Sequence, residues 1–271
     1  MDGKSTARAC IEALRRQVAA IEAGGAEGEG EAARRVSLDR GAVDAALGGG
    51  LRAGMLHEVI PDAIADAPAS SGFALALALV AAAKGEPILW VRTRAAARET
   101  GTLHADGLAA LGLDPARLVL VHLDGAVPVL SAGVDIARCT ALGAAILELW
   151  GDPKALDLTS ERRLLLAAEQ SGVTVILLRP GARAAPGGVE TRWSVASGPS
   201  RALPMNAPGP PTFDLKLLRH RHGPPAGPWR LEWNRDEQRF QPPPLLRDPD
   251  AVPRFGSLAP DSRGALRRRA S

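Results

Sequence analysis

The stretch MLHEVIPDAIADAPASSGFALALALVAAA, residues 55–83, decides the fold that we expect for this chain of 271 residues. It predicts an apolar strand over residues 55–60, a loop that ends in a small-residue turn at 67–72, and then a long helix rich in alanine and leucine. Such a strand, loop and helix N-terminus can hold phosphate, because backbone N–H groups and the helix dipole converge on an anion. The stretch therefore predicts the frame of a phosphate-binding loop.

The turn lacks the side chains with which such a loop works. A loop of the G-x-x-x-x-G-K-[ST] type uses its lysine on the phosphates and its hydroxyl on Mg²⁺. Here the lysine position holds Phe73 and the hydroxyl position holds Ala74. The loss removes charge-assisted hydrogen bonds of about 1.5–3 kcal/mol each. Two interpretations stay open: a nucleotide site that has lost its function, and a buried turn that never bound a nucleotide. The residues concerned are Ala67, Ser70, Ser71, Gly72, Phe73 and Ala74.

Four further apolar segments follow the first strand at regular intervals. They comprise residues 87–92, 118–123, 144–150 and 173–179. Each is continuously apolar, which is typical of strands buried on both faces of a parallel sheet. Helices are expected between the strands, over residues 71–83, 104–111, 129–142 and 160–170. This alternation predicts an α/β protein with a mostly parallel, doubly wound sheet and helices on both faces.

The pattern changes after Arg179. Residues 190–197, 213–220 and 229–233 alternate polar and apolar side chains, which predicts antiparallel strands at one edge of the sheet. We therefore expect a core domain over residues 36–240. Residues 1–35 are expected to form an amphipathic helix (6–22) and a glycine-rich linker. Residues 241–271 are rich in proline and arginine and too poor in apolar side chains to order themselves, so a disordered tail is expected.

Composition and charge exclude several classes of protein. A hydrophobic content of 46% supports a folded core, and the net charge is only +3. No apolar run is expected to span a bilayer, and the N-terminus lacks the apolar region of a secretory signal. Cys10 and Cys139 share no metal or redox spacing, and His57, His104 and His122 share no ligand spacing. We therefore expect a cytoplasmic protein with no membrane partner and no metal site.

The first quarter of the core domain also carries a family pattern. RecA recombinases have a Leu-Asp-x-x-L-G-x-G-G-L-x-x-G run, then V-E-I, then a phosphate loop that ends S-S-G-K-T. The chain resembles this family over about residues 36–235, which implies a RecA-like α/β/α sandwich with antiparallel C-terminal edge strands. The matching positions are Leu38-Asp39, Ala46-Leu47-Gly48, Gly49-Gly50-Leu51, Gly54, Glu58-Val59 and Ser70-Ser71-Gly72.

The altered phosphate loop, the N-terminal helix and the Pro/Arg-rich tail together make the chain similar to the ImuA family. These are RecA-like accessory proteins of the bacterial damage-inducible mutagenesis cassette, which acts in the SOS response and in translesion synthesis. The resemblance implies protein partners, namely an ImuB-like Y-family protein, an error-prone DNA polymerase and RecA. It implies no cofactor.

The positions that hydrolyse ATP in recombinases are changed in this sequence. The catalytic glutamate falls near Arg94, a cation that cannot accept a proton. The acid on the Mg²⁺ side corresponds best to Glu148, and the γ-phosphate sensor falls at Arg179-Pro180. We therefore expect no catalytic residue and no enzyme. Phe73, Trp90 and Trp150 either fill the vacated nucleotide pocket together or are unrelated core residues.

DNA contact through the expected loops at 151–159 and 180–189 is predicted to be weak, because they hold no aromatic side chain. Residues 218–222 are either a phosphate contact or, more simply, a hairpin edge protected by charge. Two other functions stay open, a SulA-like cell-division inhibitor and a residual RecA-type NTPase that uses Glu148. The candidate nucleic-acid or partner contacts are Arg219, Arg221, Arg267, Arg268 and Arg269.

Overall fold

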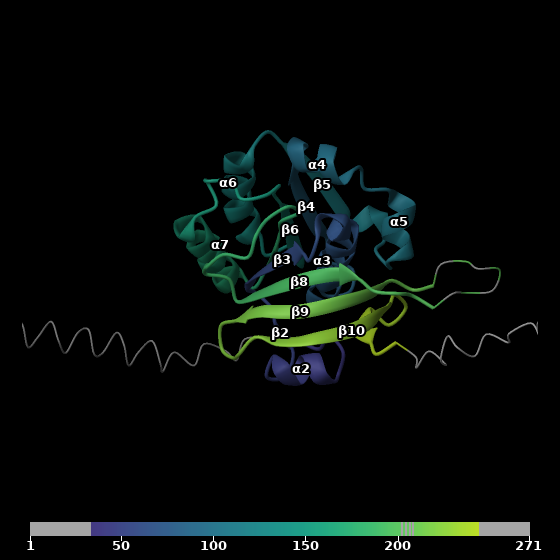
Figure 1. The fold of residues 1–271 in the computed structure, drawn as a ribbon. Coiled ribbons are helices and arrows are strands. Elements are labelled where there is room, and N and C mark those ends of the chain that lie inside the picture. Colours follow the sequence, from purple (N-terminus) through teal and green to yellow (C-terminus); the bar gives the residue numbers. More distant parts are fainter. Residues whose placement is uncertain (1–33, 202, 204, 206, 208, 244–271) are drawn as a thin grey trace, which may run out of the picture.

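A mixed sheet of nine strands forms the centre of the described chain (Figure 1). The computed structural model describes residues 34–201, 203, 205, 207 and 209–243. Five of the strands pair with one another in parallel: β3 (Leu56–Pro61), β4 (Ile88–Thr93), β5 (Leu118–Leu123), β6 (Ala144–Glu148) and β7 (Thr174–Leu178). Four more extend one side: β8 (Thr191–Ser197), β9 (Thr212–His220), β10 (Ala226–Asn234) and β11 (Arg239–Gln241). The strand order is β11-β10-β9-β8-β3-β7-β6-β4-β5.

Helices cover both faces of this sheet. On one face α3 (Ala67–Ala81) packs against β3, β6, β7 and β8, and the core there continues to the C-terminal strands. On the other face α6 (Ala126–Ala137) and α7 (Leu158–Ser171) pack against each other and against the parallel strands. The layers confirm the predicted α/β sandwich. The remaining elements are β1 (Arg35–Val36), α2 (Ala42–Ala46), β2 (Leu51–Arg52), η1 (Ile64–Asp66), α4 (Arg94–Thr100), α5 (Ala105–Ala110) and η2 (Pro115–Arg117).

The helix α3 begins earlier than the sequence predicts. Residues 67–72 were expected to form a turn, but they are the first turns of α3. Pro68 is tolerated there because the first helical N–H groups have no partner within the helix. The hydroxyls of Ser70 and Ser71 donate to the carbonyl of Ala67, at 2.8 and 3.0 Å, as they do inside a helix. The expected turn at residues 67–72 is therefore wrong, whereas the order of strand, loop and helix is as predicted.

One helical stretch of the described chain has membrane-like length and composition. Ile64–Ala81, which is η1 followed by α3, has a mean hydropathy of 1.6 over 18 residues. In the fold, 56% of this stretch is buried, and α3 lies against four strands of the sheet. Its apolar side chains are therefore those of a core helix.

Strand β5 differs from the prediction of strands buried on both faces. It is the outer strand and pairs only with β4 in the sheet. Val119 and Leu120 are 47% and 36% exposed. A continuous apolar run therefore predicted the strand correctly and its burial incorrectly, because the run does not show which strand lies at the edge.

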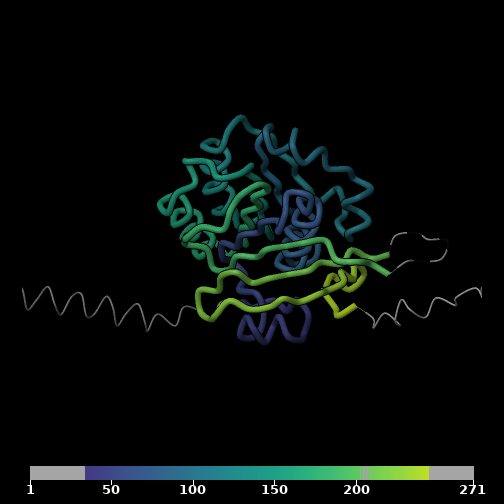
Figure 2. The backbone as a smooth tube through the Cα atoms, viewed as in Figure 1, coloured from purple at the N-terminus to yellow at the C-terminus, as the bar shows by residue number. Residues whose placement is uncertain are grey.

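The C-terminal strands are only partly antiparallel to their neighbours. β9 and β10 are antiparallel neighbours, as expected, and β11, which the sequence did not predict, extends this series. β8, however, runs parallel to β3 and antiparallel to β9. The first strand of the expected antiparallel set thus belongs to the parallel part. The chain direction changes between Ser197, where β8 ends, and Thr212, where β9 begins, and these two strand ends lie side by side in Figure 2.

The expected domain limits lie close to the ends of the described chain and stay a prediction. The N-terminal helix at residues 6–22 and the segment 244–271 lie outside the described residues. Within the described part, β1 starts at Arg35 and β11 ends at Gln241, one residue beyond each side of the predicted core. A guanidinium of Arg34 also donates to the carbonyl of Ala81, at the end of α3.

Candidate functional site

Phe73 lies in a buried aromatic cluster beside the C-terminal strands. Its ring centroid is 5.6 Å from that of Trp193, 5.8 Å from Phe213 and 5.3 Å from Phe240. Trp233 joins the cluster at 4.9 Å from Phe240. Each such pair contributes about 0.5–1.5 kcal/mol beyond its buried area. Phe73 is 0% exposed, so the residue at the lysine position is part of the core.

The structure does not bring Phe73, Trp90 and Trp150 together as one filler of a nucleotide pocket. Among the described residues, the aromatic partners of Phe73 come from β8, β9 and β11. Trp90 instead donates its Nε1–H to Glu148 at 2.9 Å. Trp150 is half-buried against the loop at Gly181. The second interpretation, unrelated core residues, fits these positions.

Glu148, the expected Mg²⁺-side acid, is buried at the carboxyl end of β6. Its Oε1 accepts hydrogen bonds from Arg92 Nη2 at 2.8 Å and from the Thr100 hydroxyl at 2.9 Å. Its Oε2 accepts from Trp90. Arg92 stands directly opposite Glu148 on β4, and both side chains are 1% exposed. Both carboxylate oxygens are therefore already bound to protein donors.

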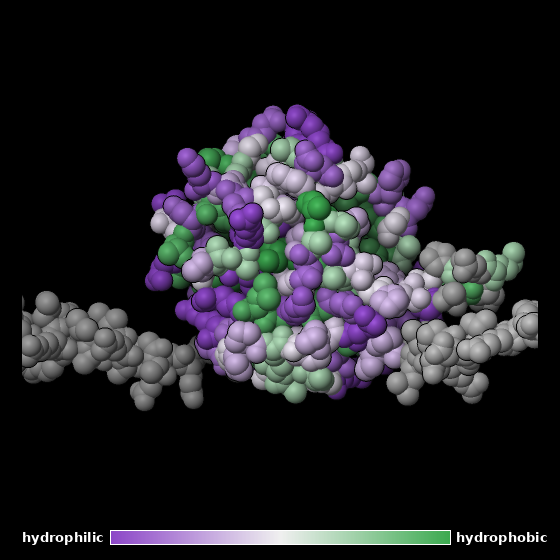
Figure 3. All heavy atoms as spheres, in the orientation of Figure 1, coloured by the Kyte–Doolittle hydropathy of each residue, from purple (hydrophilic) through white to green (hydrophobic). Residues whose placement is uncertain are grey.

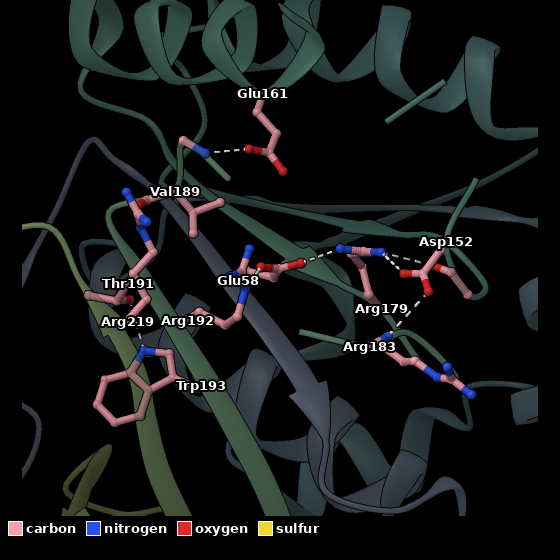
Figure 4. Close-up of polar contacts among 12 residues, drawn as sticks. Glu58, Asp152, Glu161, Arg179, Arg183, Val189, Thr191, Arg192, Trp193 and Arg219 are labelled. Carbon is pink, nitrogen blue, oxygen red and sulfur yellow. Dashed lines mark hydrogen bonds and ion pairs between the residues drawn. The ribbon is translucent and has the colours of Figure 1, made fainter. Parts of the chain in front are cut away.

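Glu58, in the middle of β3, is held in a second buried ion network (Figure 4). Its Oε1 accepts from Arg179 Nη1 at 2.6 Å, and its Oε2 pairs with Arg192 Nε. Arg179 also pairs with Asp152, in the loop after β6. Figure 4 shows Glu58 between the two guanidinium groups, with Asp152 beyond Arg179. The position expected for the γ-phosphate sensor thus carries a cation that is used inside the protein.

Arg94, where the catalytic glutamate was expected, is a surface residue. It is the first residue of α4, and its Nε lies 2.9 Å from Asp124 with both side chains largely exposed. The buried cation at this end of β4 is Arg92, two residues earlier. A buried cation thus lies close to the position where the glutamate was expected, and its partner is Glu148.

Arg219 and Arg221 lie near the end of β9, and the structure gives them different surroundings. Arg219 is half-buried and donates its Nε–H to the carbonyl of Val189 at 3.2 Å. Together with Arg192 it lines an open cavity of about 370 Å³. Arg221 is exposed. Arg267, Arg268 and Arg269 lie outside the described residues.

His57 is a buried neutral histidine at the joint of β2, β3 and β8. Burial lowers its pKa from 6.5 to about 4, against the opposing effects of the Arg52 carbonyl and Glu190. Its Nε2 lies 2.9 Å from the carbonyl of Arg52, and its Nδ1 lies 2.8 Å from the Thr191 hydroxyl. A neutral ring satisfies both contacts when Nε2 carries the proton. His57 is therefore a structural histidine.

No group of three His, Cys, Asp or Glu side chains in the described ranges is placed to hold a metal ion. Cys139 is an exposed free thiol, and Cys10 lies outside those ranges. Asp135 and Arg138 form the exposed ion pair that their spacing on α6 suggests, at 3.9 Å. The expectations of no metal and no cofactor stay predictions.

The sequence interpretation missed the ion pairs, although a signal for them was present. Arg92 and Glu58 are charged residues within strands that are mostly apolar, and charged residues are almost never fully buried unless they are paired. A search for opposite charges in neighbouring strands would have found them. It would have needed the strand order, which places β6 next to β4.

The strand order, the helices on both faces and the antiparallel C-terminal strands define a RecA-like α/β protein. A solved structure, that of the RadB recombinase, superposes on it with a TM-score of 0.50 and 15% identity, and covers 74% of this chain and 96% of its own. This likeness concerns the fold alone. No family model matches the sequence.

Two curated relatives identify the family within this class of RecA-like proteins. Both are named Protein ImuA, and they come from Caulobacter vibrioides strains NA1000 / CB15N and ATCC 19089 / CIP 103742 / CB 15. Each is 34% identical to this chain over 201 residues, which cover 68% of this chain and 77% of the relative. The chain belongs to the ImuA family.

Proposed function

We propose that this chain is a non-catalytic accessory protein of DNA-damage-induced translesion synthesis in the bacterial cytoplasm. In this role it docks an ImuB-like Y-family protein, an error-prone DNA polymerase and RecA, and it contacts DNA weakly if at all. Its membership of the ImuA family supports the assignment to damage-inducible mutagenesis.

The proposal rests mainly on Glu148, the acid that would bind Mg²⁺ beside a nucleotide. In the fold, this carboxylate is paired with residues of the protein itself. Both oxygens of Glu148 accept hydrogen bonds from Arg92, Thr100 and Trp90. A metal ion would have to displace these donors and leave Arg92 buried without its partner. Breaking a buried ion pair in this way costs about 3–5 kcal/mol. The same site therefore favours the protein's own cation over Mg²⁺.

The helix α3 adds a second argument against triphosphate binding. A phosphate loop binds through backbone N–H groups that are free to point at the anion. Residues 67–72 are helical, and Phe73 is enclosed by three aromatic rings. Binding a triphosphate there would require unwinding the start of the helix and opening the aromatic cluster.

Strand β5 supports docking onto a RecA-type partner. It is an edge strand of a parallel sheet, and its unpaired backbone groups together with Val119 and Leu120 offer a site for an added strand. On the face that Figure 3 shows, apolar residues otherwise lie in small groups among charged ones. We assign RecA docking to this edge.

Reconstitution with purified proteins tests the proposal. The chain is mixed with RecA filaments and, separately, with an ImuB-like Y-family protein, and complexes are followed by sedimentation. Binding to RecA is expected, and Val119→Asp on β5 is expected to weaken it at least tenfold. Leu158→Asp is the matched control, because Leu158 is 65% exposed at the start of α7, which packs on β3 and β7 at the other side of the parallel strands. No binding to either protein would contradict the proposed function.

The alternative functions predict other results in the same preparations. A SulA-like inhibitor would cause cells to filament when the chain is overproduced and would bind the division GTPase. A residual NTPase would release phosphate from ATP in a Mg²⁺-dependent reaction that Glu148→Gln abolishes. Nothing in the arrangement of the described residues favours either result.

A further inference from the structure

The open cavity of about 370 Å³ beside the end of β9 is not used by the proposed function. Its walls come from the segment after β7, from β8, from β9 and from the turn that leads into β10. Small or apolar side chains form most of the lining, among them Pro186 and Leu218, and its two cations are Arg192 and Arg219. A volume of about 300–1,000 Å³ is usual for ligand pockets. We call this one the Arg192 cavity, after the buried cation in its wall.

Two arginines stand opposite each other in the wall of the Arg192 cavity. Arg192 on β8 is the register partner of Arg219 on β9. The register shifts next to this pair, at Leu218, and such a bulge re-aims side chains. The successive residues Leu218 and Arg219 accordingly line the same cavity. Because like charges directly opposite each other in a sheet are destabilising, an anion between the two arginines would stabilise the pair.

Arg192 is a buried cation that uses only part of its guanidinium group within the protein. It is 5% exposed, and its Nε pairs with Glu58, a carboxylate that it shares with Arg179. Among the residues that the structure describes, its Nη1 and Nη2 make no hydrogen bond. Donors without an acceptor on a buried charged group are costly. The Arg192 cavity therefore favours a ligand that brings oxygen acceptors.

The other groups around the Arg192 cavity do not neutralise both arginines. The Nε–H of Arg219 donates to a neutral acceptor, the carbonyl of Val189, at 3.2 Å. Glu161 accepts the N–H of Gly188, and in the described chain no ion pair joins it to either arginine. Burial lowers the pKa of His220 below 6.5, so this ring of the lining is neutral at pH 7. The cavity thus offers a net positive charge to a ligand.

The lining suits a carboxylate on a peptide better than a nucleic-acid backbone. Nucleic-acid binding draws its affinity from many phosphate contacts and, for single strands, from aromatic stacking. The described lining holds two arginines and no Phe, Tyr or Trp, and Figure 4 shows the side chain of Arg183 pointing away from Arg219. A guanidinium matches the two oxygens of a carboxylate, and Pro186 and Leu218 suit apolar neighbours of that charge.

We propose that the Arg192 cavity binds an acidic side chain of a protein partner, presented on a short segment with apolar neighbours. The carboxylate lies between the two arginines and accepts hydrogen bonds from their Nη groups. The neighbouring apolar side chains pack on Pro186 and Leu218. The strands β3, β7, β6 and β4 separate β8 from β5 in the sheet. This is therefore a second docking site, independent of the one assigned to the edge strand.

Titration of the isotopically labelled full chain with a short peptide, followed by NMR, tests this site. The probe is acetyl-Gly-Leu-Glu-Leu-Gly-amide, and the control peptide has glutamine in place of glutamate. Binding is read from the Nε–H resonances of Arg192 and Arg219, both of which are hydrogen-bonded in the fold. The glutamate peptide is expected to bind at least about tenfold tighter than the glutamine peptide, because only the carboxylate makes charge-assisted hydrogen bonds with both partners ionised.

Variants of the lining locate the binding. Arg219→Gln should abolish the preference for glutamate, and Arg221→Gln, which removes an exposed arginine of the same strand end, is the matched control and should keep it. Ala185→Asp adds a competing carboxylate to the lining and should weaken binding at least about tenfold, whereas Ala185→Asn should not. Ala185 is exposed, so both substitutions leave the core intact. Val119→Asp on β5 should leave peptide binding unchanged, which separates this test from that of RecA docking.

The proposal is overturned if the glutamate peptide causes no shift at millimolar concentration, or if the glutamine peptide binds equally well. Equal losses in Arg219→Gln and Arg221→Gln would also overturn it, because they would show a general effect of charge. An oligothymidylate of about ten nucleotides is the remaining probe. If it shifts the two Nε–H resonances and the glutamate peptide does not, the cavity binds nucleic acid instead of a protein partner.

Discussion

Arg92 and Glu148 stand opposite each other on the neighbouring parallel strands β4 and β6, and their side chains meet at 2.8 Å with almost no exposure to solvent. Together they form a closed pair with Thr100 and Trp90 as further donors. The two charges are thus balanced within the protein, and the pair belongs to the core.

Replacing Arg92 with Met should destabilise the fold by about 3–5 kcal/mol, because Glu148 is left buried without its cation. Urea unfolding followed by tryptophan fluorescence measures the change. Arg94→Met is the control, since its exposed pair with Asp124 contributes about 0–1 kcal/mol. The double variant Arg92→Met/Glu148→Leu should recover much of the loss. Equal small effects of both single variants would show that the buried pair is not important for stability.

Phe73→Lys should not restore nucleotide binding, although it restores the lysine of the phosphate-loop pattern. The ammonium group would enter a cluster of Trp193, Phe213 and Phe240, where no anion lies nearby. The expected result is a loss of about 3–5 kcal/mol, at least as large as that of Phe73→Ala. Calorimetry with Mg²⁺-ATP measures binding, and Phe73→Leu serves as the control for shape. Gain of ATP affinity in the lysine variant would contradict the assignment of Phe73 to the core.

The sheet could be predicted from the sequence, while the start of α3 could not. Apolar runs such as ILWVRT and TVILL have the length and composition of buried strands, so their number and order along the chain were evident. Pro68, Ser70 and Ser71 are typical turn residues, yet a first helical turn accepts all three. The local sequence is therefore compatible with both a turn and a helix at residues 67–72. The helix is favoured because Phe73 packs on the C-terminal strands.

The ion pairs could not be predicted because they depend on spatial order. Arg92 and Glu148 are separated by 56 positions in the sequence, and the strand that follows β4 in the chain is β5. Their contact exists because β6 lies on the inner side of β4 and β5 on the outer side. The same arrangement exposes Val119 and Leu120, whose apolar character alone predicted burial. Strand order thus explains both the missed pair and the wrong burial.

Mg²⁺-ATP should leave the melting temperature of the protein unchanged. A ligand that binds only the native state stabilises it by about 2.7 kcal/mol when its concentration is one hundred times Kd. Because α3 extends through the expected loop and Glu148 is internally paired, we expect no such increase at millimolar nucleotide. Scanning calorimetry measures it, with ADP and with Mg²⁺ alone as controls. A rise of several degrees that needs both ATP and Mg²⁺ would favour the residual NTPase.

Acid should destabilise the protein through His57 before it protonates most carboxylates. The pKa of His57 is lowered in the fold to about 4 from 6.5, so the folded state favours the neutral ring. Its contribution to stability is complete above pH 6.5 and is lost as the pH falls from 6.5 towards 4. The loss between pH 7.5 and pH 5 is roughly 2 kcal/mol for this one group. Urea unfolding at the two pH values measures it.

The surroundings of His57 decide which control is informative. Glu190 opposes the shift, while Arg52 and His220 reinforce it, and burial lowers the pKa of His220 as well. His57→Gln keeps a donor for the Arg52 carbonyl and removes the titrating group. The variant should therefore lose roughly 2 kcal/mol less stability than the parent between pH 7.5 and pH 5. His104→Gln, at the exposed start of α5, should keep the full dependence of the parent. If both variants retained the pH dependence of the parent, His57 would not be its source. The next group to test would be His220, whose pKa is affected by Glu190 and His222.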